Sequence, residues 1–414
     1  MKVRRLAVAA LLSVLLVVAP ASARVQPRVH VQVLGHANPG GGYAGDVYAF
    51  GRFAYLSSWH GAKCRAQGVR VYGIGNPRQL SHVATFADAA SDPATAGAWT
   101  EKTIVKRVST PSFKGALAVV SFQSCTGTGS FHGFGLYDVT NPARPRKLAL
   151  VRTEPRGVHE IWLQAVGRHA YVYAAIPYAE ERNLPGLRIY DVTDPANPSW
   201  ISSWRPPVGR NTGIGDMKAT FVHSVITNRS GTRAFVSDWD YGTVILDVRN
   251  PRKPRQLSRT RFRADEEGNA HSTAVTPDGK LMIETHEWEL TRPTLYDISN
   301  PRKPRRLSVF NPPSRLISRA RAAGASGLQT GVHDPKIVGH RVYFSWYALG
   351  VLVADISNPR RPRFLTQFLP TSAADPDVAF CPGGRCVAVW GVFPTRSYAL
   401  ASDMVGGLWS FRVR

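Results

Sequence analysis

A short motif recurs along this chain at nearly constant spacing, and it constrains the fold more than any other feature. Asp138-Val-Thr-Asn-Pro is followed three residues later by a second proline, and equivalent copies begin at Asp191, Asp247, Asp297 and Asp355. The aspartates are 53, 56, 50 and 58 residues apart. A repeat of this length indicates one supersecondary unit that stacks on its neighbours to bury a shared core.

Each motif lies between two segments that we expect to form strands. An apolar run such as 351–353 precedes the motif, and an alternating run such as 306–310 follows it. Proline cannot donate to a β-ladder and Asn-Pro favours turns, so the motif itself predicts the turn between these strands. Upstream, alternating runs such as 224–227 and 234–237 flank turn residues and predict a second hairpin. Four strands in about 50 residues are typical of a propeller blade.

Counting the second strand of each unit predicts seven blades and an all-β fold. The last unit ends at 408–413 and lacks a fourth strand, whereas the segment 27–33 resembles the fourth strand of another unit. We therefore expect the N-terminal strand to complete the last blade and close the ring, which removes the open sheet edges of a linear solenoid. The seven second strands are expected at 55–56, 117–120, 171–173, 235–236, 282–283, 343–344 and 387–389.

The repeated apolar strand followed by Asp-Val-Ser/Thr-Asn-Pro resembles the LVIVD repeat family of secreted and surface propellers. The resemblance covers nearly the whole chain after residue 23, and it implies a β-propeller in an extracellular setting without implying a reaction. Composition agrees with this fold class. An apolar content of 43% with 10% aromatic residues excludes intrinsic disorder, and 30 prolines with 36 glycines exclude a coiled coil.

The first 23 residues are typical of a secretory signal peptide. A basic start that includes Lys2 precedes an apolar run over 6–19, and Ala21-Ser22-Ala23 matches a cleavage signature. The run is too short to span a bilayer, so we expect cleavage after Ala23, one exported domain over 24–414, and no transmembrane segment. Arg4-Arg5 leaves a twin-arginine export route open.

Export permits disulfide bonds among the four cysteines. Cys381 and Cys386 lie on either side of a Pro-Gly turn and are expected to close a hairpin. Cys64 and Cys125 then pair by elimination. The chain contains no C-x-x-C motif, which argues against a zinc or thioredoxin-like site.

The net charge of +24 is concentrated in the repeated turns, which should share one face of a propeller. Such a basic ring predicts either a surface for a polyanion, such as an anionic envelope polymer, or merely solvated turns. Nucleic acid is not expected, because no aromatic residues interleave these turns. The thirteen cations are Arg144, Arg146, Lys147, Arg252, Lys253, Arg255, Arg302, Lys303, Arg305, Arg306, Arg360, Arg361 and Arg363.

Acidic residues outside the repeat are expected mostly in loops of the opposite face. The repeated aspartates themselves precede turns, so we interpret them as hydrogen-bonding the turn backbone, not as catalytic. The acidic loop residues are Glu180, Glu181, Asp216, Asp238, Asp240, Asp265, Glu266, Glu267, Glu287, Glu289 and Asp403.

Four successive blades carry a histidine at the start of the first strand, namely His159, His223, His271 and His333. First strands line the channel of a propeller, so these imidazoles are expected to converge near its axis. They predict either a site for Zn, Cu or Fe or a repeat residue that hydrogen-bonds a neighbouring blade.

The other three blades show Gly45, Thr100 and Pro376 at about the place of these histidines. Glu160 and Asp334, which follow two of them, are candidates to orient a ring nitrogen. His286 is a further candidate that reaches the site from a neighbouring loop.

Two functions therefore follow from the sequence. The first is a secreted, non-catalytic binding or scaffold module whose partner is a protein, a glycan or an anionic envelope polymer. The second is a metal-dependent oxidoreductase or hydrolase-like enzyme with an axial histidine site, similar in style to the selenium-binding and methanethiol oxidase propellers. The sequence contains no G-x-S-x-G elbow and no P-loop, so neither of those chemistries is expected.

Overall fold

The computed structural model describes residues 29–414 except 62, 65–67, 126–128, 180–181, 208–220, 264–265, 267, 290 and 379. The predicted signal peptide over 1–23 lies outside the described residues, as do five of the acidic loop residues, Glu180, Glu181, Asp216, Asp265 and Glu267. No helix in the described part of the chain has the length and apolar content that crossing a bilayer requires.

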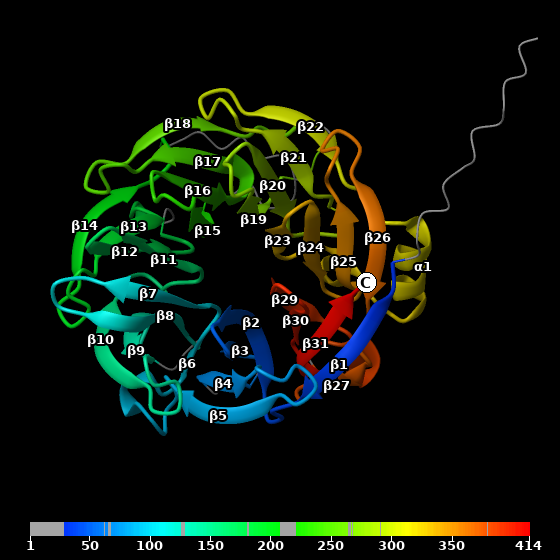
Figure 1. Cartoon of the computed structure of the whole chain (residues 1–414), viewed down its shortest axis with the longest axis horizontal. Helices are drawn as coiled ribbons and strands as arrows, with labels where there is room; N and C mark the ends of the chain where they lie inside the picture. Colours follow the sequence, from blue (N-terminus) through cyan, green and yellow to red (C-terminus); the bar gives the residue numbers. More distant parts are fainter. Residues whose placement is uncertain are drawn as a thin grey trace, which may run out of the picture.

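Seven antiparallel sheets stand around a central axis, as Figure 1 shows, which confirms the predicted seven-bladed β-propeller. The first four blades, each from its innermost strand outwards, are β2 (Tyr43–Phe50), β3 (Phe53–Trp59), β4 (Val69–Gly73), β5 (Ser81–Phe86); β7 (Thr103–Ser109), β8 (Lys114–Ser124), β9 (Gly133–Asp138), β10 (Arg146–Arg152); β11 (Ile161–Val166), β12 (His169–Ala175), β13 (Leu187–Asp191), β14 (Ser199–Trp204); and β15 (Val222–Thr227), β16 (Arg233–Asp238), β17 (Gly242–Asp247), β18 (Arg255–Arg259). The other three are β19 (Ala270–Val275), β20 (Leu281–His286), β21 (Thr294–Asp297), β22 (Arg305–Val309); β23 (Pro335–Val338), β24 (Arg341–Trp346), β25 (Gly350–Asp355), β26 (Arg363–Phe368); and β29 (Val389–Pro394), β30 (Ala399–Asp403), β31 (Gly407–Val413), β1 (Val31–Ala37).

Smaller elements lie in the connections between these strands. β6 (Ala98–Trp99) extends the second blade by pairing with β8, and β27 (Ala373–Ala374) pairs with β28 (Arg385–Cys386). The helical pieces are α1 (Ser314–Ala322), η1 (Pro93–Thr95), η3 (Trp239–Tyr241), η4 (Gly327–Thr330) and η5 (Pro382–Gly384).

The N-terminal strand closes the ring, as predicted. β1 pairs antiparallel with β31, with Val31 opposite Val413 and Ala37 opposite Leu408, so the last blade contains both ends of the described chain. This pairing gives β31, the third strand of the last blade, a neighbour on both sides.

One strand of the last blade differs from its prediction. Residues 387–389 lead into the first strand of that blade, β29, and the second strand is β30. The long connection over 369–388 carries β27, β28 and a disulfide. It lengthens this unit, so the segment predicted as the second strand falls at the first strand. Because first and second strands are both buried and apolar, hydrophobic pattern alone does not distinguish them.

The repeated aspartates hold their turns, as the sequence indicated. In each of the five copies, one carboxylate oxygen accepts the backbone N–H two residues later. The pairs are Asp138–Thr140, Asp191–Thr193, Asp247–Arg249, Asp297–Ser299 and Asp355–Ser357, at 2.8–3.2 Å. An aspartate used in this way sets the turn geometry and is not available for chemistry.

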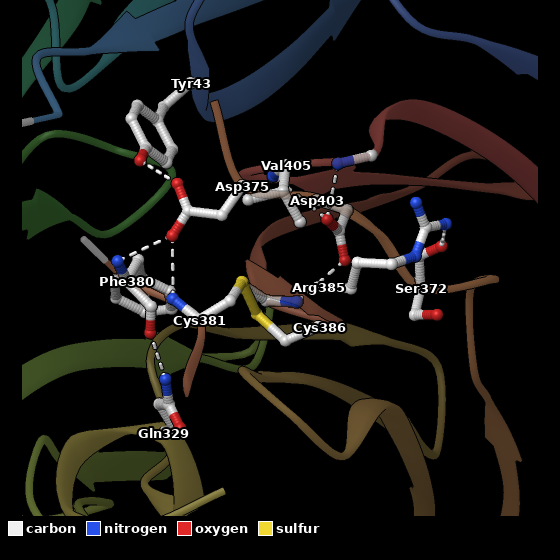
Figure 2. The surroundings of a disulfide bond; sticks show 12 residues. Tyr43, Gln329, Ser372, Asp375, Phe380, Cys381, Arg385, Cys386, Asp403 and Val405 are labelled. Carbon is white, nitrogen blue, oxygen red and sulfur yellow. Dashed lines mark hydrogen bonds between the residues drawn. A yellow bond between two sulfur atoms is a disulfide. The ribbon is translucent and has the colours of Figure 1, made fainter. Parts of the chain in front are cut away.

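Both predicted disulfides are formed, and both lie in loops of the face opposite the basic turns. Cys64–Cys125 links the first blade to the second, and Cys381–Cys386 closes the loop before β29. Figure 2 shows how Asp375 fixes this second loop: its carboxylate accepts the backbone N–H groups of Phe380 at 2.6 Å and Cys381 at 2.7 Å, and also the hydroxyl of Tyr43.

Candidate functional site

The four predicted histidines meet near the axis of the ring. His159 Nε2 lies 3.0 Å from His223 Nε2, and the ring centroids of His223 and His271 are 3.9 Å apart. His333 continues the row, with its centroid 4.4 Å from that of His271. His223, His271 and His333 are at most 4% exposed, so the cluster forms the buried floor of the channel mouth.

A β-bulge directs these side chains toward the axis. The register between β15 and β16 shifts between Val222 and Ser224, and that between β19 and β20 shifts between Ala270 and Ser272. His223 and His271 are therefore the extra residues of two equivalent bulges, a device that re-aims a side chain at the end of a ladder.

Hydrogen bonds leave several imidazole nitrogens unused. His271 Nδ1 lies 2.9 Å from the carbonyl oxygen of His333, and since a carbonyl only accepts, this nitrogen donates and Nε2 keeps its lone pair. That Nε2 has no hydrogen-bond partner among the described residues, nor has His223 Nδ1 or either nitrogen of His333. Nδ1 of His159 donates to Gln123 Oε1 at 2.6 Å in the same way. A backbone or amide acceptor on one ring nitrogen is the arrangement that orients a metal-binding imidazole.

Glu287, which was predicted only as an acidic loop residue of this face, completes the cluster. Its Oε2 lies 3.3 Å from His271 Nε2, and its Oε1 accepts the hydroxyl of Tyr347 and lies 4.0 Å from His333 Nε2. One ligand atom each from His223, His271 and Glu287 lie within 4.8 Å of one another, close enough to hold one metal ion. Glu287 follows β20 directly, and its approach to the axis depends on the path of the β20–β21 loop, which strand periodicity does not predict.

His286 does not join this cluster. Its Nε2 lies 2.9 Å from Glu284 Oε1, between the fourth and fifth blades. Adjacent residues of a strand point to opposite faces, so His286 and Glu287 cannot both reach the axis from the end of β20.

Glu160 and Asp334 bind a lysine and do not orient the imidazoles, which corrects the role expected for them. Lys102 Nζ lies 2.6 Å from Glu160 Oε2, 3.4 Å from Asp46 Oδ2 and 3.6 Å from Asp334 Oδ2. These carboxylates come from three different blades, so one buried cation ties blades on several sides of the ring.

Burial controls the charge of the cluster. Burial lowers the pKa of His159 to about 3. Burial, together with the neighbouring imidazoles or Lys102, holds the pKa values of His223, His271 and His333 well below the usual range of histidine. Burial also raises the pKa of Glu287 to about 8. The imidazoles are therefore neutral at physiological pH.

The remaining three blades place other residues at the histidine position. The register shift between β29 and β30 puts Trp390 there, and the ladder beside β7 puts Glu101 there, whereas Gly45 is as predicted. The sequence predicted Thr100 and Pro376 at this position, and both placements were wrong. The connections before β7 and β29 are longer than the repeat, so its spacing selected the wrong residues. Trp390 Nε1 donates to Glu101 Oε1 at 2.6 Å, which closes the axis on the side without histidines.

A cavity of about 780 Å³ opens over the imidazoles. Its lining comes from loops of the same face in several blades and includes both cysteines of the Cys64–Cys125 bridge. The aromatic lining residues are Trp99, Tyr178, Phe221, Trp239, Trp288 and Trp390.

On the other face, about half of the predicted basic ring is neutralised by carboxylates. The arginine eight residues after the repeated aspartate pairs with it in four turns, and three more cations reach other acids. The pairs are Arg146–Asp138, Arg255–Asp247, Arg305–Asp297, Arg363–Asp355, Arg252–Asp191, Lys147–Asp92 and Arg306–Glu266. Within the described ranges, the other six form no ion pair within 4.0 Å: Arg144, Lys253, Arg302, Lys303, Arg360 and Arg361.

Comparison with known proteins agrees with this architecture. The crystal structure of Raptor from Chaetomium thermophilum is similar with a TM-score of 0.59 at 12% sequence identity, over 92% of this chain and 29% of the Raptor chain. The chain thus spans less than a third of Raptor, and at this identity the likeness shows the fold alone. No curated protein matches the sequence. The LVIVD repeat model matches residues 230–259, which run from the turn before β16 to the end of β18. The chain is therefore a seven-bladed β-propeller that contains an LVIVD repeat.

Proposed function

We propose that this propeller binds one transition-metal ion at the channel mouth and presents it to a small molecule in the cavity above. The observation that carries the proposal is the meeting of His223, His271 and Glu287 within 4.8 Å, with buried imidazole nitrogens that have no hydrogen-bond partner among the described residues. Buried polar atoms are normally hydrogen-bonded, so such nitrogens in a group of potential metal ligands favour a ligand there. The proposal takes the metal-dependent alternative in preference to the non-catalytic module.

The donor set indicates the class of metal. Imidazole suits Zn, Cu, Fe and Ni, and two histidines with one carboxylate is a set used for zinc and for non-haem Fe(II). His159 and His333 lie next to this set and offer further neutral nitrogens. When bound, such an ion supplies Lewis-acid activation of a coordinated water or ligand oxygen. The chain's own part is to keep the imidazoles oriented, through Gln123 and the carbonyl of His333.

Metal analysis of the purified protein tests the proposal. We expect about one equivalent per chain after loading with Zn²⁺, Cu²⁺ or Fe²⁺ separately, and loss of that metal in the His223→Ala, His271→Ala double variant. His82→Ala is the matched control, because His82 lies on the outer strand β5 and contacts Thr85. Retention of no metal by the folded wild-type protein, after loading with each of the three, would overturn the proposal.

Export from the cell is part of the proposed setting. Two disulfides agree with an oxidising compartment, where such bonds persist. Detection of the mature protein outside the cell, with an N-terminus at residue 24 by mass spectrometry, tests this setting. A mature chain that still contains residues 1–23 would contradict it.

A second candidate function is the binding of an anionic envelope polymer by the basic face. The six cations without a carboxylate partner favour it, since paired ones contribute little to an external field. Retention on an immobilised anionic polysaccharide is expected to fall in Arg302→Gln, Lys303→Gln. The control is Arg305→Gln, whose guanidinium already binds Asp297 at 2.7 Å. Equal retention of both variants and the wild type would leave these turns as solvated surface.

A further inference from the structure

The cavity over the imidazoles has the shape and chemistry of a site for a flat aromatic anion. This inference rests on the proposed function, because it concerns the ligand that the metal would meet. A volume of about 780 Å³ is within the range of small-molecule sites, which run from about 300 to 1,000 Å³. Its lining includes His223 and Glu287 of the metal-ligand set.

One wall of the cavity is a stack of nearly parallel rings. Tyr178 and Phe221 are 5.2 Å apart with an interplanar angle of 24°, and Phe221 and Trp239 are 4.8 Å apart at 21°. The stack leads down to the floor, where the Trp239 centroid is 5.3 Å from that of His223. Rings stacked on one another present their edges along the side of the stack, and a ligand with a planar π-system can meet such edges in edge-to-face contact, which gains energy beyond burial.

Indoles from other blades border the rest of the floor. Trp390 packs on His333 with centroids 4.3 Å apart, and Trp99 lies 6.0 Å from His159. Trp59 joins these two indoles from behind, at 5.9 and 6.3 Å. Aromatic residues from separate blades therefore meet around one space.

Charge is distributed asymmetrically in this cavity. Arg156 is the only lysine or arginine among its described lining residues, and it is exposed, with its guanidinium 4.9 Å from the Tyr178 ring. Glu287 is the only acidic residue among the described lining residues, and it lies at the floor beside His271. Within that described lining, a ligand with one anionic end would find a permanent counter-charge at Arg156, at the opposite end of the aromatic stack from the imidazoles.

We propose that the cavity binds a planar aromatic carboxylate, with its carboxylate at Arg156 and an oxygen substituent on the ring directed toward the imidazoles and Glu287. Edge-to-face contact with Tyr178 and Phe221 would hold the ring between these two ends. Arg156 is a binding residue in this arrangement and contacts no group that holds the metal.

Isothermal titration calorimetry of the metal-loaded protein tests this inference with three probes. They are 4-hydroxycinnamate, its methyl ester and cyclohexanecarboxylate. We expect 4-hydroxycinnamate to bind best, the ester about tenfold more weakly because the charge is lost, and the saturated acid more weakly still because it has no π-system to contact the aromatic rings. Arg156→Ala should reduce the affinity for 4-hydroxycinnamate about tenfold and leave that for the ester unchanged.

Several outcomes would overturn the inference while leaving the metal site intact. One is the absence of heat with 4-hydroxycinnamate in protein that carries stoichiometric metal. Another is equal affinity for the planar and the saturated acid, which would remove the role of the aromatic stack. A third is an equal loss for acid and ester in Arg156→Ala. Metal content is measured on the same samples, so failure of metal loading is recorded separately. Arg182→Ala is the control, a surface arginine beyond the cavity lining.

Discussion

Lys102 is the buried cation on which carboxylates from three blades converge, and its replacement tests how the centre of the ring is held together. We predict that Lys102→Met lowers the free energy of unfolding by about 3–5 kcal/mol at pH 7, the cost of removing one partner from a buried charge network. The three carboxylates lie 2.6, 3.4 and 3.6 Å from Nζ, and all four side chains are at most 7% exposed. Water therefore cannot replace the lysine, and the loss is a large part of the total of about 5–15 kcal/mol typical of a domain.

Urea unfolding followed by circular dichroism, with metal-free protein and intact disulfides, measures this loss. Lys336→Met is the matched control: its ammonium also binds Asp334, but its side chain is 29% exposed, so its removal should cost at most about 1 kcal/mol. The double variant Lys102→Met, Glu160→Gln should regain stability relative to the single variant, because one uncompensated carboxylate becomes neutral. A loss below about 1 kcal/mol for Lys102→Met, or one no larger than that for Lys336→Met, would refute the reasoning.

Three further predictions concern single carboxyl groups. Asp297→Ala should cost about 1 kcal/mol in urea unfolding, because it removes the turn hydrogen bond to Ser299 and an exposed ion pair with Arg305. Glu101→Gln should change stability by less than about 1 kcal/mol, because burial raises the pKa of this carboxyl well above the usual range and glutamine keeps an oxygen that accepts the Trp390 indole N–H. Glu101→Leu should cost about 1–3 kcal/mol by leaving that N–H unpaired. Burial raises the pKa of Asp403 to about 6, above its value of about 4 in the unfolded chain. The contribution of the protonated carboxyl to stability is therefore lost as pH rises from about 4 to about 6. Asp403→Asn should make the unfolding free energy less dependent on pH over that range.

Each of these predictions has a result that contradicts it. Full stability of Asp297→Ala would show that the proline pair alone sets the turn. A loss well above about 1 kcal/mol for Glu101→Gln would contradict the reasoning that the amide substitutes for the carboxyl. An unchanged pH dependence in Asp403→Asn would assign the slope between pH 4 and 6 to other groups.

The repeat made most of the fold predictable from sequence. Its proline turns fix strand boundaries, and the unpaired last strand calls for a partner that only the N-terminus supplies. The assignment of the second strand was wrong in the last blade. An insertion over 369–388 interrupts the repeat spacing there, and the buried first strand has the same apolar pattern as a second strand. The pairing that neutralises part of the basic ring was not predicted, although four of the five copies have an arginine eight residues after the aspartate.

The candidate site was only half predictable, for a physical reason. The histidines were found because they occupy equivalent positions on first strands, where the repeat fixes both depth and direction. Glu287, Tyr178 and Trp288 lie in loops between second and third strands, which differ in length from blade to blade. Whether such a loop turns toward the axis depends on its packing against neighbouring loops, which no periodicity records.

The departures from the repeat explain why four imidazoles meet on one side of the axis. At the histidine position, a Cβ on Gly45 would lie 3.1 Å from the backbone oxygens of Glu101 and Thr100, so glycine lets the first and second blades approach closely here. Gly391 directly follows Trp390, and a Cβ on Gly391 would lie 2.1 Å from an Asp46 carboxylate oxygen. The absence of that Cβ lets Asp46 approach Lys102. The exceptions thus lie in the seventh, first and second blades, and the histidines in the four between. A residue kept merely by repetition would extend around the ring; here three neighbouring blades instead build a closed, charged side, against which the imidazoles face Glu287.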